Sequence, residues 1–181
     1  MVLCVKAGTL RIAPRIAPRH GGWPTRATTQ DAVLSSVKLG KSDLNVSEVC
    51  LGCMMFGSQN TEKEAHEILS AATDMGVNFL DTSEGYPIPP REATTGRSTT
   101  YVGNWLKNSN VKREDIVIAT KVAGYAKEES VGFIAAARTD PPSKRTDLHL
   151  DAKSIEAAVD CELRRLGIDC IDLMQTHWPD R

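Results

Sequence analysis

The stretch Cys161–His177 reads CELRRLGIDCIDLMQTH. It contains the end of an expected helix, a glycine that ends this helix, and an expected strand. Leu163 and Leu166 lie on the apolar face of an expected helix, and Gly167 favours a helix end. The apolar run that follows, residues 170–177, is typical of a strand buried on both faces of a parallel sheet. This helix–stop–strand unit predicts an α/β protein.

The same alternation of strands and helices runs back toward residue 36 and predicts consecutive βα units with a parallel sheet. The buried face of the first helix is expected to consist of Ala65, Ile68, Leu69 and Ala72. The expected elements are a hairpin over residues 36–46, a strand over 49–54, a helix opened by the capping box Thr61–Glu64, a strand over 77–81, a helix over 100–107, a strand over 115–121, a helix capped by Asp151 and the strand over 170–177.

Length and charge exclude several classes of protein. The chain has 181 residues, 22 Lys and Arg, 23 Asp and Glu and a formal net charge of −1, so no nucleic-acid or membrane partner is indicated. No apolar run approaches the ~18 residues of a membrane span. A complete eight-stranded α/β barrel typically needs about 250 residues. Neither glycine-rich phosphate motif, G-x-G-x-x-G or G-x-x-x-x-G-K-[ST], occurs.

The cysteines are few, odd in number and scattered, which argues against a disulfide scaffold and predicts reduced thiols. They are Cys4, Cys50, Cys53, Cys161 and Cys170. Cys50 and Cys53 form a C-x-x-C pair. A packing role is favoured over metal or redox chemistry because no second pair of ligands accompanies them, and no metal site is expected.

The first segment differs from the rest of the chain. It carries five basic residues before its first acidic residue, Asp31. We interpret residues 1–33 as an organellar transit peptide, with a plastid favoured over a mitochondrion. The alternative is a disordered basic tail on a cytoplasmic protein. The domain expected to carry the function covers residues 34–181.

Polar side chains stand at the ends of successive expected strands. Asp81, Lys121 and His177 end three strands, and Tyr86 follows Asp81 by five residues. Each alone has an ordinary reading: a turn cap, a solvated lysine, a hydrogen-bonded histidine. In a parallel α/β barrel the carboxyl ends of the strands converge on one site. The set therefore predicts a single site.

This set of side chains is suited to carbonyl reduction. A free phenol has a pKa near 10, and a neighbouring ammonium stabilises the phenolate and makes the phenol a better acid. A carboxylate beside the ammonium keeps it charged and in place, and an imidazole orients the carbonyl oxygen. The hydride must come from a bound nicotinamide, because no side chain supplies one.

Four runs make the chain resemble the aldo/keto reductase family, in the branch of the Tas-type bacterial proteins and their plant and algal counterparts. The resemblance covers residues 36–181 and is carried by NFLDTSEGYPIPPRE, YVGNWL, IVIATKV and ELRRLGIDCIDLMQTHWPDR. It implies a (β/α)8 TIM barrel, with about the first four βα units present after a short hairpin. It also implies NADP(H) as cofactor and a small-molecule carbonyl compound as substrate.

The resemblance assigns roles to individual residues. Asp81, Tyr86, Lys121 and His177 correspond to a catalytic tetrad in which Tyr86 donates the proton and borders the substrate. The implied cofactor contacts near the nicotinamide are Gly52, Cys53, Met54 and Asp81, and Trp178 is implied to line the substrate pocket with Tyr86.

The chain departs from the family pattern at a few positions. The family often has Thr at the position of Cys53 and Glu at the position of Thr99, and the Tas-type pattern has Glu at the position of Ala93. The loop over residues 122–150, with its apolar run GFIAAA, is expected either to shape substrate choice or to be a poorly ordered insertion.

The largest departure is that the chain stops after the fourth expected strand. The later strands and loops, which hold the phosphates and adenosine in the family, are expected to follow in a longer reductase. As it stands, the chain is expected to need a complementing C-terminal half or partner chain, because a half barrel leaves two sheet edges open.

Other functions compete with carbonyl reduction. One is a regulatory relative without turnover. Another is an aldolase in which Lys121 forms a Schiff base. A hydrolase that pairs Asp81 with Glu84 is weaker, because paired glycosidase carboxylates face each other across a substrate.

Overall fold

The computed structural model describes residues 34–125 and 148–180. The expected leader, residues 1–33, and most of the expected loop over residues 122–150 lie outside the described residues. Within the described residues, no helix combines the length and apolar character needed to cross a membrane.

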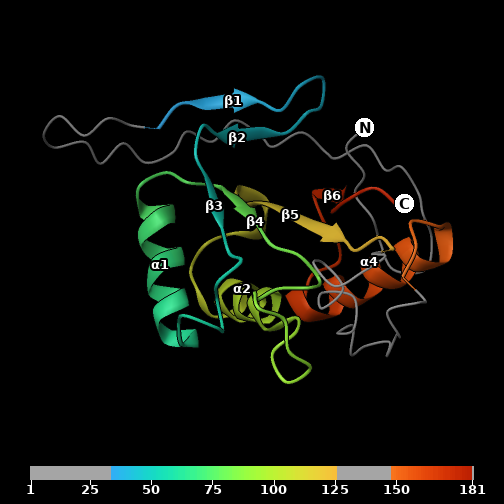
Figure 1. The fold of residues 1–181 in the computed structure, drawn as a ribbon. Coiled ribbons are helices and arrows are strands. Elements are labelled where there is room, and N and C mark those ends of the chain that lie inside the picture. The colour runs from blue at the N-terminus through green and yellow to red at the C-terminus, as the bar shows by residue number, and fades with distance from the viewer. Residues whose placement is uncertain (1–33, 126–147, 181) are drawn as a thin grey trace, which may run out of the picture.

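The described elements follow the expected order of strands and helices (Figure 1). They are β1 (Ser36–Lys38), β2 (Asn45–Ser47), β3 (Cys50–Gly52), α1 (Glu62–Asp74), β4 (Phe79–Asp81), α2 (Arg97–Asn108), the 3-10 helix η1 (Arg113–Asp115), β5 (Val117–Val122), α4 (Ala152–Leu166) and β6 (Leu173–Thr176).

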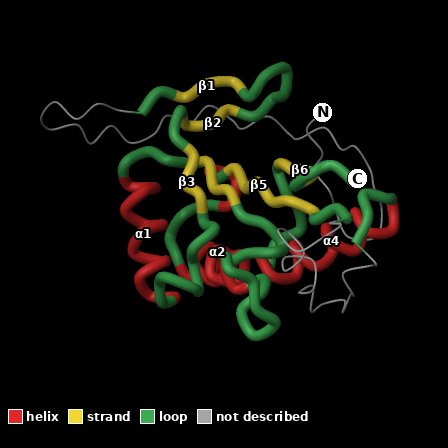
Figure 2. The backbone as a smooth tube through the Cα atoms, in the orientation of Figure 1, coloured by secondary structure: helices red, strands yellow, loops and turns green. Residues whose placement is uncertain are grey.

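Two sheets form from these strands. β1 and β2 pair antiparallel as the expected hairpin, and β3, β4, β5 and β6 form a parallel sheet in that order. Helices α1, α2 and α4 lie along one side of the parallel sheet, and the hairpin lies across its amino-terminal end (Figure 2). The hairpin is held there by apolar contacts of Leu44 and Val46 with Val117 at the start of β5. The parallel βα arrangement confirms the expected fold class.

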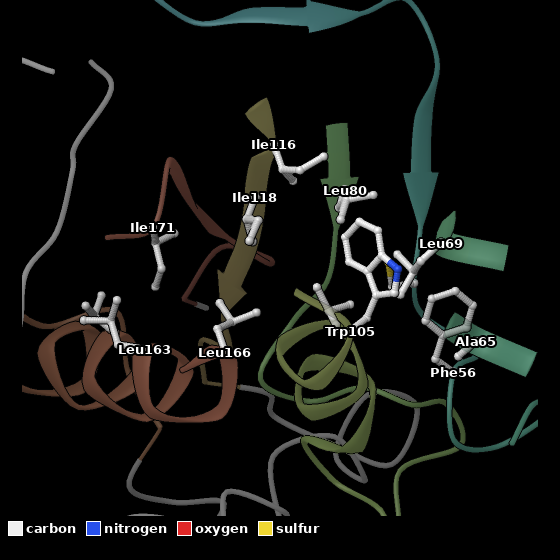
Figure 3. Packing of buried hydrophobic residues seen from close by; sticks show 13 residues of the cluster. Phe56, Ala65, Leu69, Leu80, Trp105, Ile116, Ile118, Leu163, Leu166 and Ile171 are labelled. Atoms are coloured by element: carbon white, nitrogen blue, oxygen red, sulfur yellow. The ribbon is translucent and has the colours of Figure 1, made fainter. Parts of the chain in front are cut away.

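The core fills the space between the sheet and its three helices. Side chains from β4 and β5, including Leu80 and Ile118, meet Leu69 of α1, Trp105 of α2 and Leu166 of α4 (Figure 3). Leu69, Ile118 and Leu80 are at most 1% exposed, so this contact is dry and the burial of apolar area drives the helices onto the sheet.

Helix ends follow the local sequence signals. The capping box at Thr61 and Glu64 is present in full, with Thr61 Oγ1 accepting from the Glu64 amide and the Glu64 carboxylate accepting from the Thr61 amide. Asp151 caps α4, and Gly167 ends it with a φ of 65°. These three signals are confirmed.

Other details of the expected elements are wrong. Ile68, expected on the buried face of α1, is 38% exposed, because helical spacing shows which residues share a face and not how far that face is covered. Helix α2 begins at Arg97 rather than at residue 100, since Gly96 adopts a φ of 79° and starts the helix earlier. Asp115 belongs to η1, and β5 starts two residues later.

The thiols behave in two ways. Cys50, Cys53 and Cys161 are not disulfide-bonded, as expected, whereas Cys170 is, so the expectation of a reduced thiol is wrong there. Burial raises the pKa of Cys50 to about 11 and that of Cys53 to about 12. Both thiols are therefore protonated at neutral pH. Burial supports a packing role for Cys53 but not for Cys50, which is exposed.

Candidate active site

The carboxyl ends of the parallel strands bring the expected site residues together. In the sheet register Gly52 of β3 pairs with Asp81 of β4, and Lys121 of β5 pairs with Gln175 of β6. His177 follows β6 directly, and its backbone amide donates to the Val122 carbonyl at 2.9 Å. Polar side chains from three strands thus project at one edge of the sheet.

An ion pair lies at the centre of this edge. Lys121 Nζ is 2.5 Å from Asp81 Oδ2, and it also donates to the Thr82 carbonyl at 2.9 Å. The Lys121 and Asp81 side chains are 14% and 28% exposed, so the pair is shielded from solvent without being sealed off. Gln175 Nε2 donates to the other Asp81 oxygen at 3.1 Å, which fixes the carboxylate from the side of β6.

Tyr86 lies against the ammonium and the imidazole. Its ring centre is 4.9 Å from Lys121 Nζ and 5.6 Å from the centre of the His177 ring, which it meets edge-on. The Tyr86 residue is only 7% exposed. All four residues of the expected tetrad therefore lie in one cluster.

His177 is uncharged at neutral pH. Burial, and then the positive charge of Lys121, lower its pKa from 6.5 to about 4, against the opposing effect of Asp81. Ser83 Oγ lies 3.3 Å from His177 Nδ1, which orients the ring. A neutral imidazole can donate from one nitrogen to a carbonyl oxygen without holding a net charge.

Trp178 extends the cluster outward. Its ring centre lies 4.7 Å from that of His177. The indole Nε1 donates to the Gly124 and Tyr125 carbonyls, at 3.1 and 3.2 Å. The ring is part-buried and packs against Leu148. These contacts hold Trp178 beside His177. That Trp178 lines the substrate pocket stays a prediction.

Besides Asp81, the residues expected near the cofactor are Gly52, Cys53 and Met54, and they are placed differently from one another. Gly52 is exposed at the tip of β3, and a side chain there would meet no other atom within 4 Å. Met54 is 40% exposed. The Cys53 side chain is fully buried, while its amide donates to the Asp81 carbonyl at 2.8 Å. A ligand beside Asp81 would therefore meet Gly52 and Met54 rather than the Cys53 thiol.

Sequence reasoning missed Gln175 and Ser83. Gln175 of β6 stands two residues before His177, which directly follows the strand, so a period of two continued past the strand end puts both on one face, a signal that was available. Ser83 could not be found this way, because it belongs to the irregular loop after β4 and meets His177 only through the fold.

Glu84 lies away from the Asp81 carboxylate. It is 3% exposed, and its Oε1 accepts a hydrogen bond from the Ala123 amide at 2.7 Å. A carboxylate used in this way does not face Asp81 across a substrate, which removes the support for a paired-carboxylate hydrolase.

A second charged group is buried behind the cluster. Glu162 of α4 is 0% exposed and accepts from Thr120 Oγ1 at 2.6 Å, from Thr99 Oγ1 at 2.9 Å and from Arg165 Nη1 at 3.0 Å. Burial raises the pKa of Glu162, against the opposing charge of Arg165. Thr99, where the family often has Glu, therefore faces a carboxylate supplied by another helix.

Three comparisons place this geometry among known proteins. Residues 48–181 match the sequence model of the aldo/keto reductase family. The chain is 42% identical over 144 residues to the protein tas of Escherichia coli, covering 80% of this chain and 38% of that protein. It is 32% identical over 143 residues to a probable voltage-gated potassium channel subunit beta of Arabidopsis thaliana, covering 78% and 37%.

Solved structures give the same result. The chain superposes on the holo form of the aldo-keto reductase AKR11C1 from Bacillus halodurans with a TM-score of 0.58 and 32% identity. That match covers 79% of this chain and 40% of the other. The chain thus spans about two fifths of the length of the relatives that it matches.

Proposed function

This chain belongs to the aldo/keto reductase family of oxidoreductases, and we propose on that premise that it carries the catalytic tetrad of an enzyme that reduces an aldehyde or ketone with NADPH. One observation carries the proposal. The Lys121 ammonium lies between the Asp81 carboxylate and the Tyr86 ring, at 2.5 Å from the first and 4.9 Å from the centre of the second. This supports Tyr86 as a general acid, because a nearby cation stabilises the phenolate that proton transfer leaves behind.

Tyr86 is the proposed proton donor. When a carbonyl carbon gains a hydride, negative charge develops on its oxygen, and a proton must reach that oxygen. The Tyr86 hydroxyl supplies the proton, and the Lys121 charge stabilises the phenolate left behind. Asp81 accepts a hydrogen bond from Lys121 and so holds the ammonium charged at this position.

His177 is the proposed orienting group. Because its pKa is about 4, it is neutral at physiological pH and serves as a hydrogen-bond donor or acceptor rather than as a cation. The edge-on contact with Tyr86 places both groups on the same side of the site. A carbonyl oxygen between them would be held by two side chains at once, which lowers the entropy cost of reaching the reactive geometry.

The described residues fit the nicotinamide end of a cofactor. Gly52 leaves open space at the tip of β3 directly beside Asp81, and Met54 is exposed next to it. We propose that this tip receives the nicotinamide, which supplies the hydride when NADPH is bound.

The test is reduction of a panel of aldehydes and ketones by the intact protein, followed by the loss of NADPH absorbance, with NADH in parallel. Tyr86→Phe is expected to remove turnover and to leave NADPH binding in place. Lys112→Met, which removes an exposed lysine before β5, is the matched control and is expected to keep wild-type rates. Turnover by the Tyr86→Phe protein at the wild-type rate would contradict the assignment of the proton donor.

A regulatory role without turnover is the second candidate, because one relative is named as a probable channel subunit. The same assay separates the two functions. The regulatory role would be favoured if NADPH quenches the fluorescence of Trp178 in the folded protein but no carbonyl compound is reduced. Turnover that depends on Tyr86 would favour the enzyme.

A Schiff-base aldolase is disfavoured by the ion pair. Imine formation needs Lys121 Nζ free to attack a carbonyl carbon, whereas this atom donates hydrogen bonds to Asp81 and to the Thr82 carbonyl. Borohydride added with a carbonyl substrate is expected to leave Lys121 unlabelled. A covalent adduct at Lys121 would reverse this assignment.

An organellar location is proposed from residues 1–33 alone. This segment has basic residues and no acidic residue before Asp31, a composition that supports a transit peptide. A fluorescent protein fused behind residues 1–33 is expected in plastids. A diffuse cytoplasmic signal would argue against the proposal.

A further inference from the structure

Helices α2 and α4 approach each other closely behind the site. A Cβ added to Gly103 of α2 would lie 2.5 Å from the Arg165 carbonyl oxygen and 2.7 Å from the Leu166 Cα. Only glycine permits this contact between the two backbones, because the atoms that a Cβ would meet are backbone atoms of α4. The close approach brings side chains of α4 under the loop that leads from β4 to α2.

Arg165 reaches this loop from α4. Its Nη1 donates to the Glu84 carbonyl at 3.1 Å, two residues before Tyr86, and to Glu162 Oε1 at 3.0 Å. A Cβ added to Gly96 would lie 2.2 Å from the Arg165 Cζ, so the guanidinium packs directly against Gly96. The side chain is 11% exposed.

Both contacts bear on Tyr86. The Gly96 amide donates to the Tyr86 carbonyl at 2.7 Å, so Gly96 holds the backbone of Tyr86 directly. Arg165 therefore contacts the loop at two places. One is Glu84, two residues before Tyr86, and the other is Gly96, whose amide is hydrogen-bonded to the Tyr86 carbonyl.

Glu162 fixes the guanidinium. Its carboxylate is fully buried, and besides Arg165 it accepts from Thr99 on α2 and from Thr120, the residue before Lys121. Through Arg165, Glu162 is linked to the loop that carries Tyr86. Through Thr120 it is linked to the strand that carries Lys121, so one buried carboxylate connects both segments.

We propose that Arg165, held by Glu162, is a positioning residue that sets the Tyr86 ring against Lys121 and His177. The proposal rests on the proposed function for its kinetic consequence. The positioning itself does not depend on turnover, since it concerns the place of the Tyr86 ring.

The test uses Arg165→Met in the intact protein, with Arg164→Met as the matched control, because Arg164 is the neighbouring arginine on α4 and is exposed. Arg165→Lys is the conservative variant. The first readout is the nuclear magnetic resonance signal of the His177 ring protons, identified with His177→Asn. These protons report the Tyr86 ring, which meets His177 at 5.6 Å between centres.

Arg165→Met is expected to shift the His177 signals, and Arg164→Met is expected to leave them in place. Arg165→Lys is expected to restore them in part, because an ammonium can bind Glu162 but lacks the planar fork. The second readout is kinetic. Displacing a reacting group by about an ångström costs up to roughly a hundredfold in rate, so kcat should fall by roughly tenfold to a hundredfold while KM for NADPH stays within about twofold.

If Arg165→Met fails to fold, Glu162→Gln replaces it, because it keeps the size and one acceptor of the side chain and removes the charge that holds Arg165. It is expected to shift the His177 signals in the same direction. His177 signals unchanged in a folded Arg165→Met or Glu162→Gln protein would overturn the proposal. So would an equal shift in Arg164→Met. If the wild-type protein reduces no carbonyl compound, the proposed function fails, and the resonance of His177 still decides the positioning.

Discussion

Lys121 Nζ lies 2.5 Å from the Asp81 carboxylate, and this pair joins two adjacent strands of the parallel sheet at their carboxyl ends. Neither residue is near the other in sequence, and the pair exists because β4 and β5 run parallel in register. The ammonium is thereby held over the Tyr86 ring. The fold thus puts beside Tyr86 the positive charge that the proposed chemistry uses.

Replacing Lys121 with Met should remove the charge and keep most of the side-chain volume. General acid–base catalysis contributes roughly a hundredfold to ten-thousandfold to a rate, so kcat for carbonyl reduction should fall by roughly a hundredfold or more. The measurement is steady-state NADPH oxidation. Lys112→Met serves as the control, and comparable losses in both variants would show that the effect is not specific to the site.

Replacing Gln175 with Leu should loosen the Asp81 carboxylate, because it removes the 3.1 Å hydrogen bond from Nε2. The loss of one hydrogen bond to a charged group corresponds to about 1.5 kcal/mol, which is roughly tenfold in rate. We expect kcat to fall by roughly this factor, less than for Lys121→Met. A Gln175→Leu enzyme with wild-type kcat would show that Asp81 needs no support from β6.

His177 should make the stability of the protein depend on pH. In the unfolded chain its imidazole takes up a proton near pH 6.5, and in the folded protein only near pH 4. Between these values the unfolded state binds more protons, so the free energy of unfolding falls as the pH drops from about 6.5 toward 4 and gains nothing further above 6.5. This is the behaviour of a group whose folded pKa is depressed.

Denaturant titrations across this pH range measure the effect. His177→Asn should reduce the slope, because asparagine does not titrate, whereas His149→Asn, which changes a half-exposed imidazole outside the cluster, should retain it. Equal slopes for the wild-type and His177→Asn proteins would contradict the depressed pKa.

Thr99 and Glu162 should be replaceable only together. Thr99→Glu would put a second carboxylate against Glu162, whose Oε2 lies 2.9 Å from Thr99 Oγ1. A buried charge without a partner costs about 3–5 kcal/mol, so the single variant should be destabilised by an amount on that order. Thr99→Glu combined with Glu162→Thr leaves one carboxylate and should recover most of the loss. A double-mutant cycle of unfolding free energies that is additive would exclude this coupling.

Parts of the fold were predictable because their signals are local. The capping box at Thr61 and the positive-φ glycine at Gly167 mark helix ends through atoms a few residues apart, so the sequence alone is enough. The exposure of Ile68 was not predictable, because helical spacing says which residues share a face and not what packs on that face. The early start of α2 at Gly96 depends on the loop that precedes it.

The site divides in the same way. Asp81, Lys121 and His177 were found because each ends a strand, and parallel strands gather their ends at one edge. Gln175 could have been found from its spacing to His177, whereas Ser83, Arg165 and Glu162 needed the structure. Their partners come from loops or from a different helix, and sequence distance says nothing of such contacts.

The amino-acid sequence by itself determined the order of the elements, the parallel sheet and the three strand ends that carry acid, amine and imidazole, because hydrophobic period and terminal residues are properties of single segments. Only the tertiary structure decided that the Tyr86 ring meets both Lys121 and His177, and that a buried ion pair on α4 lies behind its loop. These contacts join segments that are far apart in the chain, so no single segment carries a signal for them.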